Sequence, residues 1–197
     1  MLTDITDEPD LNPSAFEEGL ALWSNGDGTP DATTYDALPH ARLARNDVDF
    51  GTCLELRKTD GVVRLRYTGE MPVRRGARIE ISARLRALRG PLPEVRIAAW
   101  TGGAGGRGVE GQPCEGPRVA LTAHGSVQVV RAVIGPEAAD GVDLVWSAEV
   151  LYAHVGLDLT GPVGGVVRIE SVTARDVTRA MTGGGRVMPG FTTADAR

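Results

Sequence analysis

The amino-acid sequence predicts an all-β sandwich, and three observations lead to this fold class. Apolar and polar residues alternate with a period of two through most of the chain, which is the pattern of strands that bury one face. No window combines the spacing of an amphipathic helix with capping residues at both ends. The 26 glycines and 12 prolines punctuate the alternating segments at roughly ten-residue intervals, as in sandwiches and barrels.

The clearest predicted strand spans residues 79–87. Its apolar side chains alternate with glutamate, serine and two arginines, so one face is apolar and the other is solvated. The same alternation predicts further strands at residues 53–56, 63–67, 95–97, 127–134, 144–146, 155–159 and 166–169.

The two ends of the chain differ from its middle. Residues 1–15 are acidic, contain two prolines and show no alternation, which predicts an extended arm. Residues 179–197 are rich in glycine and predict a flexible tail or a docking segment. We therefore expect the sandwich domain over residues 16–178, with the glycine-rich stretch 101–116 as a long surface loop.

Composition excludes several classes of protein. The chain has 197 residues, of which 42% are hydrophobic and 24% charged, as in one ordinary globular domain. The formal net charge of −5 argues against nucleic acid as a partner, because phosphate binding needs a basic surface. No apolar run approaches the roughly 20 residues of a membrane-spanning helix, and the acidic N-terminus does not resemble a secretory signal. Two cysteines, Cys53 and Cys114, cannot build a disulfide framework or a zinc ribbon.

The sequence also lacks the arrangements that carry catalysis. His40, His124 and His154 lie far apart and belong to no metal or nucleophile motif, and no Gly-x-Ser-x-Gly elbow is present. The glycine-rich loop contains fragments of a phosphate-binding fingerprint, but no predicted helix follows it. We therefore expect no enzyme activity and no cofactor.

One segment raises the question of a calcium ion. Asn25, Asp27 and Asp31 place oxygen-bearing side chains at alternate positions, as calcium loops do. However, Pro30 replaces the glycine that such a loop requires, and no flanking helix is predicted. A turn rich in glycine and aspartate explains the same residues, and both interpretations stay open at this point.

Among the aromatic residues, Trp100 is the strongest candidate for contact with a ligand. It is out of phase with Val95, Ile97 and Ala99, so its side chain points away from the face that those residues bury. The ring is therefore expected either to stack on a sugar or a partner, or to be buried beneath the glycine-rich loop. Tyr152 and Arg107 are the other candidate contacts with a glycan or a partner.

Two groups of segments resemble known families. Residues 16–23 (FEEGLALW) and 167–177 (VRIESVTARDV) resemble the opening and closing of jelly-roll carbohydrate-binding modules. The segments WSNGDGTP (23–30), DFGTCLEL (49–56), RIAAWTGGAGG (96–106) and GLDLTGPVGGVVRI (156–169) are longer and more specific. Together they resemble the N-terminal domain of pectate-lyase-like, glycoside hydrolase 28-related spike proteins that are encoded with alphaproteobacterial gene transfer agents, which are phage-like particles.

The resemblance implies a structural protein without enzyme activity. In the spike family a β-helix follows this domain and recognises polysaccharide, whereas this sequence ends at Arg197. We therefore expect the base of a head spike on the surface of a phage-like particle, assembled in the cytoplasm and released by lysis. Its implied partners are the capsid protein, a polysaccharide-binding spike fibre and further copies of itself. The alternative is a stand-alone carbohydrate-binding module that contacts polysaccharide directly.

The predicted arm suggests how such a base attaches. Leu2, Ile5 and Leu11 are spaced so that an extended chain presents them to successive shallow pockets of a capsid. The acidic residues between them would face basic capsid groups. The alternative is a frayed terminus without a role.

Overall fold

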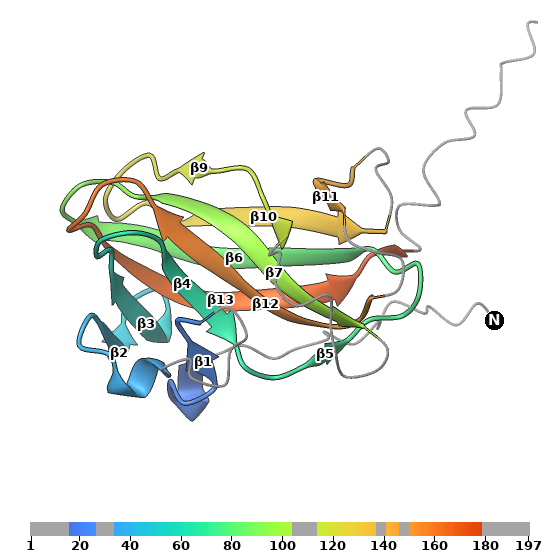
Figure 1. The fold of residues 1–197 in the computed structure, drawn as a ribbon. Coiled ribbons are helices and arrows are strands. Elements are labelled where there is room, and N and C mark those ends of the chain that lie inside the picture. Colours follow the sequence, from blue (N-terminus) through green and yellow to red (C-terminus); the bar gives the residue numbers. More distant parts are fainter. Residues whose placement is uncertain (1–15, 27–33, 104–113, 137–140, 146–149, 179–197) are drawn as a thin grey trace, which may run out of the picture.

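The computed structural model describes residues 16–26, 34–103, 114–136, 141–145 and 150–178, which form a two-layer jelly-roll β-sandwich (Figure 1). The all-β prediction is confirmed. Within these ranges, the helical segments are the two short 3-10 turns η1 (Phe16–Glu18) and η2 (Tyr35–Ala37). None of the described helices is long and apolar enough to span a membrane. The predicted arm, with Leu2, Ile5 and Leu11, and the predicted tail lie outside the described residues.

The first layer, which we call the β12 sheet, has β12 (Val150–Thr160) at its centre. Its order is β1-β4-β12-β7-β8, and β5 and β9 pair with β12 and β7 at the margins. The other strands of this sheet are β1 (Trp23–Ser24), β4 (Val63–Tyr67), β5 (Met71–Pro72), β7 (Glu94–Gly103), β8 (Cys114–Glu115) and β9 (Val119–Ala120).

The second layer, the β6 sheet, has the order β11-β10-β6-β13-β3-β2. Its strands are β2 (Ala41–Asp47), β3 (Gly51–Arg57), β6 (Ile79–Arg89), β10 (Gln128–Gly135), β11 (Leu144–Val145) and β13 (Val166–Asp176). Only β10 and β11 run parallel among the described pairs. Each predicted strand corresponds to one in the structure, apart from Trp146, which lies outside the described residues.

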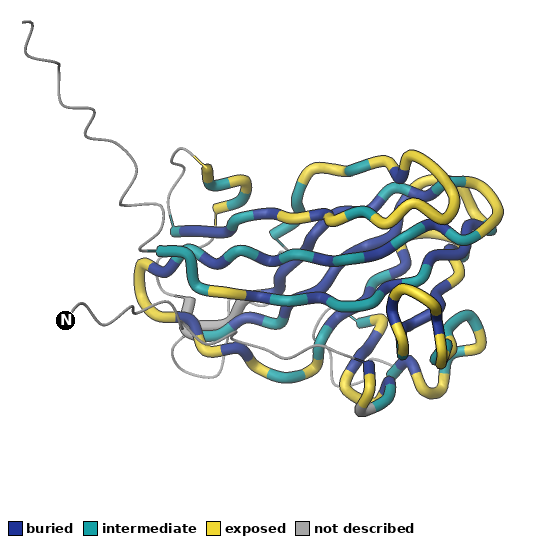
Figure 2. The backbone as a smooth tube through the Cα atoms, turned by 180° about the vertical axis from the view of Figure 1, so that it is seen from behind, coloured by how far each residue is buried: buried dark blue, intermediate teal, exposed yellow. Residues whose placement is uncertain are grey.

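The core lies between the two sheets and follows from the alternation in the sequence. In β6 every second residue from Ile79 to Ala87 is buried (Figure 2), and the residues between them are only partly buried. Trp23, expected from the sequence to be a core residue, is 2% exposed. Its ring centroid lies 5.1 Å from that of Phe16 and 5.4 Å from that of Tyr67. These contacts pack the N-terminal turn against the edge of the β12 sheet.

The outer face of the β6 sheet is covered by ion pairs that join its strands. Arg168 of β13 donates hydrogen bonds to Asp47 at 2.6 Å and to Glu55 at 3.0 Å. Arg86 also donates to Asp47 at 2.5 Å, and Arg42 donates to Glu55 at 2.7 Å. Both carboxylates are almost fully buried. Four strands are thereby linked through two acidic side chains.

Asp47 also shapes the turn between β2 and β3. Its Oδ1 accepts hydrogen bonds from the backbone N–H groups of Asp49 and Phe50, at 3.0 and 3.1 Å. Asn46, just before it, has a φ of 60°, a conformation that asparagine tolerates better than most residues. Burial by itself raises the pKa of Asp47. The hydrogen bonds from Arg168 and the backbone, with the nearby charge of Arg86, outweigh it and lower the pKa from 3.8 to about 2.

The structure predicts a loss of stability in acid that depends on Asp47. Because its pKa is lower in the folded than in the unfolded state, its contribution is complete above about pH 4 and is lost as the pH falls towards about 2. We expect Asp47→Asn to lower the melting temperature at pH 7, and to lose less stability than the wild type between pH 4 and pH 2. Thermal unfolding followed by circular dichroism checks this; parallel losses in both proteins would contradict it.

Candidate functional site

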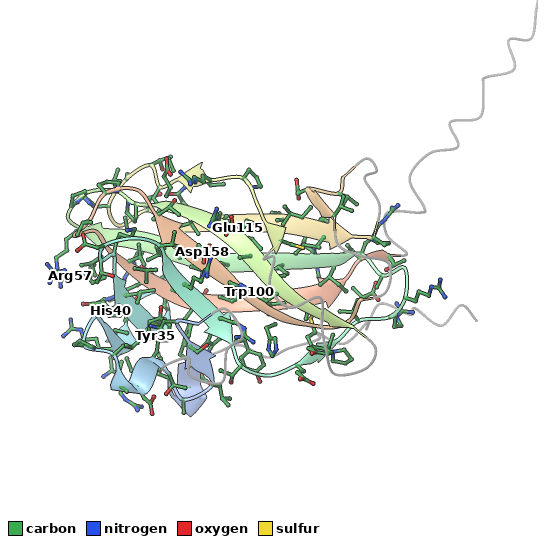
Figure 3. All side chains as sticks on the ribbon, in the orientation of Figure 1. Tyr35, His40, Arg57, Trp100, Glu115 and Asp158 are labelled. Atoms are coloured by element: carbon green, nitrogen blue, oxygen red, sulfur yellow. The ribbon has the colours of Figure 1, made fainter. Side chains whose placement is uncertain are left out.

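The outward face of the β12 sheet gathers charged and aromatic residues from four strands. In β12, Ala153, Val155, Leu157 and Leu159 point into the core, so the residues between them point outward. The strand register places Arg64 of β4 and Arg96 of β7 on either side of Asp158. Figure 3 shows Asp158, Glu115 and Trp100 together over this sheet.

Asp158 and Arg96 form the centre of a buried charged row. Asp158 is fully buried and Arg96 is 9% exposed. Arg96 Nε and Nη2 donate to Asp158 Oδ2 at 3.0 and 2.8 Å, and Arg96 Nη1 and Nη2 contact the two carboxylate oxygens of Glu115 at 2.5 Å. Arg64 Nε lies 3.5 Å from Asp158 Oδ1. The row is therefore held rigidly across four strands.

Burial and the neighbouring arginines act in opposite directions on the pKa of Asp158. Burial raises the pKa of Asp158, and the hydrogen bonds from Arg96 and the charge of Arg64 oppose this increase. The side chains of Arg64 and Glu115 remain 24% and 30% exposed. The row thus presents a guanidinium donor and a carboxylate acceptor to solvent, and both are fixed by the buried pair beneath them.

Trp100 lies in the same face, next to this row. Its indole is 4% exposed, so the structure agrees with burial and not with an open stacking platform. The guanidinium carbons of Arg64 and Arg66 lie 6.0 and 5.9 Å from its ring centroid, within the range of a cation–π interaction. Among the described residues, Trp100 Nε1 has no hydrogen-bond partner. This nitrogen is itself buried.

Two small residues separate the charged row from Trp100. Gly156 of β12 and Ala98 of β7 are neighbours in the register and lie between the charged row and Trp100. A Cβ at Gly156 would lie 1.9 Å from the carbonyl oxygen of Leu65, so only glycine fits there.

Tyr152 and His154 continue this face along β12. Both are half-buried, and their ring centroids are 6.0 Å apart in an edge-to-face arrangement. Burial lowers the pKa of His154, so its imidazole is neutral near pH 7. His154 Nδ1 lies 3.0 Å from the carbonyl oxygen of Gly69, which identifies it as the protonated nitrogen. Its Nε2 is then an acceptor.

The structure brings together only some of the residues singled out from the sequence. Trp100 and Tyr152 share one face, whereas Arg107 lies outside the described residues. Asn25 is exposed, and Asp27 and Asp31 also lie outside the described ranges. Within those ranges, no group of three metal-ligating side chains is found.

The charged residues of the site were missed by the sequence analysis. They lie at the polar positions of the predicted strands, and the alternation predicts that such positions are exposed to solvent. These residues are Arg64, Arg66, Arg96 and Asp158. The sequence did contain one indication of the site. The alternation in β12 places Asp158 on the same face of the strand as His154 and Tyr152.

Comparison with known proteins identifies solved structures with a similar fold. No protein-family model matches the chain, and no curated protein matches it. Among similar solved structures is the CBM22-1 xylan-binding domain of Paenibacillus barcinonensis Xyn10C, which has a TM-score of 0.53 and 11% identity over 86% of this chain and 95% of that one.

Two further structures are similar. The CBM22-1–GH10 modules of Clostridium thermocellum Xyn10B, complexed with xylohexaose, have a TM-score of 0.57 and 10% identity over 95% of this chain and 30% of that one. TmCBM61 in complex with β-1,4-galactotriose has a TM-score of 0.52 and 10% identity over 86% and 99%. At these identities the likeness shows the fold, a β-sandwich of the kind found in carbohydrate-binding modules.

The charged row predicts a specific pattern of stability. Arg96→Met leaves Asp158 buried without its main partner, and we expect it to lower the free energy of unfolding by about 3–5 kcal/mol. The double variant Arg96→Met with Asp158→Leu removes both buried charges and should recover most of this loss. Chemical denaturation of the three proteins measures the difference. A double variant no more stable than the single one would contradict the structural role of the pair.

Proposed function

We propose that this protein is a non-catalytic module that binds polysaccharide on the outward face of the β12 sheet. One observation carries the proposal: the half-buried rings of Tyr152 and His154 lie on the same face as the row of Arg64, Asp158 and Arg96. Aromatic rings beside fixed polar groups are what a pyranose needs, because its C–H face is apolar and its hydroxyl rim is polar.

The accessible groups suit this ligand. Tyr152 and His154 are half-buried, so each keeps part of its ring open to contact. Arg64 and Glu115, with 24% and 30% of their side chains exposed, provide a donor and an acceptor. Modules of the same fold have been solved with xylohexaose and with β-1,4-galactotriose, which supports a glycan ligand for this chain.

The test is a glycan array, followed by calorimetric titration of the best glycan. We expect Tyr152→Ala to weaken binding about two- to twelvefold, because the ring's stacking contribution is about 0.5–1.5 kcal/mol. The matched control is Val129→Ala, which removes an exposed apolar side chain from the other sheet and should leave the affinity unchanged. Equal losses in both variants, or no glycan bound by the wild type, would refute the proposal.

A second candidate function concerns where this module works. We infer that it is the base of a head spike on a phage-like particle, contacting the capsid protein, a spike fibre and other copies of itself. The observation that favours this is the resemblance of segments 23–30, 49–56, 96–106 and 156–169 to spike proteins of gene transfer agents. Polysaccharide binding and this location are compatible, because a spike on a particle surface meets the polysaccharide of a host cell.

The arm supplies the test of this location. We expect deletion of residues 2–12, which include Leu2, Ile5 and Leu11, to leave the melting temperature of the sandwich nearly unchanged and to remove the protein from purified particles. Unfolding curves and quantitative immunoblots of purified particles provide the two measurements. If the truncated protein decorates particles at full occupancy, the arm is not the anchor. If the intact protein does not copurify with particles at all, the location is wrong.

A further inference from the structure

A hollow lies at one end of the sandwich, away from the face described above. It consists of two adjoining volumes of about 220 and 400 Å³, which share Pro39, His40 and Arg57 in their linings. The turn before β2, the end of β3 and the turn between β12 and β13 border it. Figure 3 shows Arg57 and His40 at this end, with the Arg57 side chain directed away from the sheets.

The walls of the hollow are joined by backbone hydrogen bonds. Arg57 N donates to the carbonyl of His40 at 2.9 Å, and Lys58 N donates to that of Gly165 at 2.8 Å. Gly164 N donates back to the carbonyl of Lys58 at 2.9 Å. Three segments that are distant in sequence are therefore held together, and the hollow has a fixed shape.

Positive charge is in excess in the lining. The four cations Arg42, Arg57, Arg89 and Lys58 face two carboxylates, those of Glu55 and Asp60. Glu55 is already bonded to Arg42 and to Arg168, and Arg89 reaches it only at 3.5 Å, with 62% of its own side chain exposed. Arg57 is exposed and has no ion pair among the described residues.

Lys58 adds a positive charge that no carboxylate in the described part of the chain neutralises. It is 1% exposed, and its ammonium group donates to the carbonyls of Thr59 and Gly61. Its hydrogen-bond partners among the described residues are therefore carbonyl oxygens and not carboxylates.

The remaining lining adds apolar surface. Val163 is 52% exposed on one side of the hollow, and Pro39 forms part of the other. Burial lowers the pKa of His40, so its imidazole is neutral near pH 7 and adds no charge. The ligand that fits is therefore an oxyanion attached to a ring with an apolar face.

We propose that this hollow binds the carboxylate of an acidic sugar unit, with the guanidinium groups of Arg57 and Arg89 as donors. A planar carboxylate matches the paired N–H groups of a guanidinium, and the attached sugar ring would lie against Val163 and Pro39. The assignment of the ligand as a sugar rests on the proposed polysaccharide binding. The inference that an oxyanion binds rests only on the charge and shape of the hollow.

The experiment titrates the full chain with trigalacturonate and, in parallel, with neutral β-1,4-galactotriose. Arg57→Gln and Arg89→Gln should each raise the Kd for trigalacturonate about three- to tenfold, as expected for charged hydrogen bonds at a partly exposed site. Arg45→Gln is the matched control, because Arg45 is exposed and does not line the hollow. It should change the Kd less than twofold.

Each result has a defined meaning. An equal loss from Arg45→Gln would show diffuse charge attraction and overturn the site. Inorganic phosphate that displaces trigalacturonate at equal concentration would reveal a bare oxyanion site and overturn its assignment to a sugar acid. If a neutral glycan binds through Tyr152 while trigalacturonate does not bind, the hollow has no such role and the proposed function stands. If only trigalacturonate binds, dependent on Arg57 and not on Tyr152, the hollow is supported and the binding face of the β12 sheet is wrong.

Discussion

The register of β12 against β4 and β7 is the constraint on which both the core and the candidate site depend. The same strand sends Val155, Leu157 and Leu159 into the core and directs His154 and Asp158 to the outside. Because side chains alternate, a slip of one residue would bury the polar set and expose the apolar one. Gly156 strengthens this constraint, since the carbonyl of Leu65 lies where a side chain would be. Correct packing of the core thus also sets the positions of Asp158 and Arg96.

The two outer faces of the sandwich use their charges differently. On the β6 sheet, Asp47 and Glu55 are satisfied by arginines and backbone N–H groups, and these contacts tie strands and a turn together. On the β12 sheet, the ion pairs lie beside an indole whose N–H has no partner among the described residues, and beside half-buried rings. In the first arrangement both carboxylates are almost fully buried. In the second, the side chains of Arg64 and Glu115 remain partly exposed.

The fold could be predicted from the sequence because its long strands carry a strong local signal. The alternation in residues 79–87 and 155–159 identifies β6 and β12 without any knowledge of their neighbours. The short strands β1, β5, β8 and β9, of two residues each, carry no such pattern and exist only through pairing with longer ones. The edge strand β2 was also missed, because Ala41–Asp47 has polar residues on both faces and shows no clear alternation.

The candidate site could be predicted only in part, for the same physical reason. The alternation in β7 alone predicts that Trp100 points outward. Its burial, however, depends on residues of other strands, among them Arg64 and Arg66. The charged row forms only when β4, β12 and β7 pair in the correct register, which brings Arg64, Asp158 and Arg96 together. No single segment of the sequence encodes this register. Likewise, the end hollow joins Pro39, Arg57 and Val163 through turns whose relative positions are set by the whole sandwich.

The energetics of the charged row bear on its purpose. Desolvating Asp158 and Arg96 costs free energy that their mutual attraction only roughly recovers, and well-packed apolar residues at such positions are often as stabilising or more so. Stability alone therefore does not account for a buried charged row on the outward face of a sheet. A requirement for fixed, directional hydrogen-bonding groups does account for it, because the buried pair immobilises Glu115 and Arg64 where solvent and a ligand reach them. In this interpretation the cost in stability is offset at the binding step, since groups that are already ordered lose little entropy when a glycan arrives.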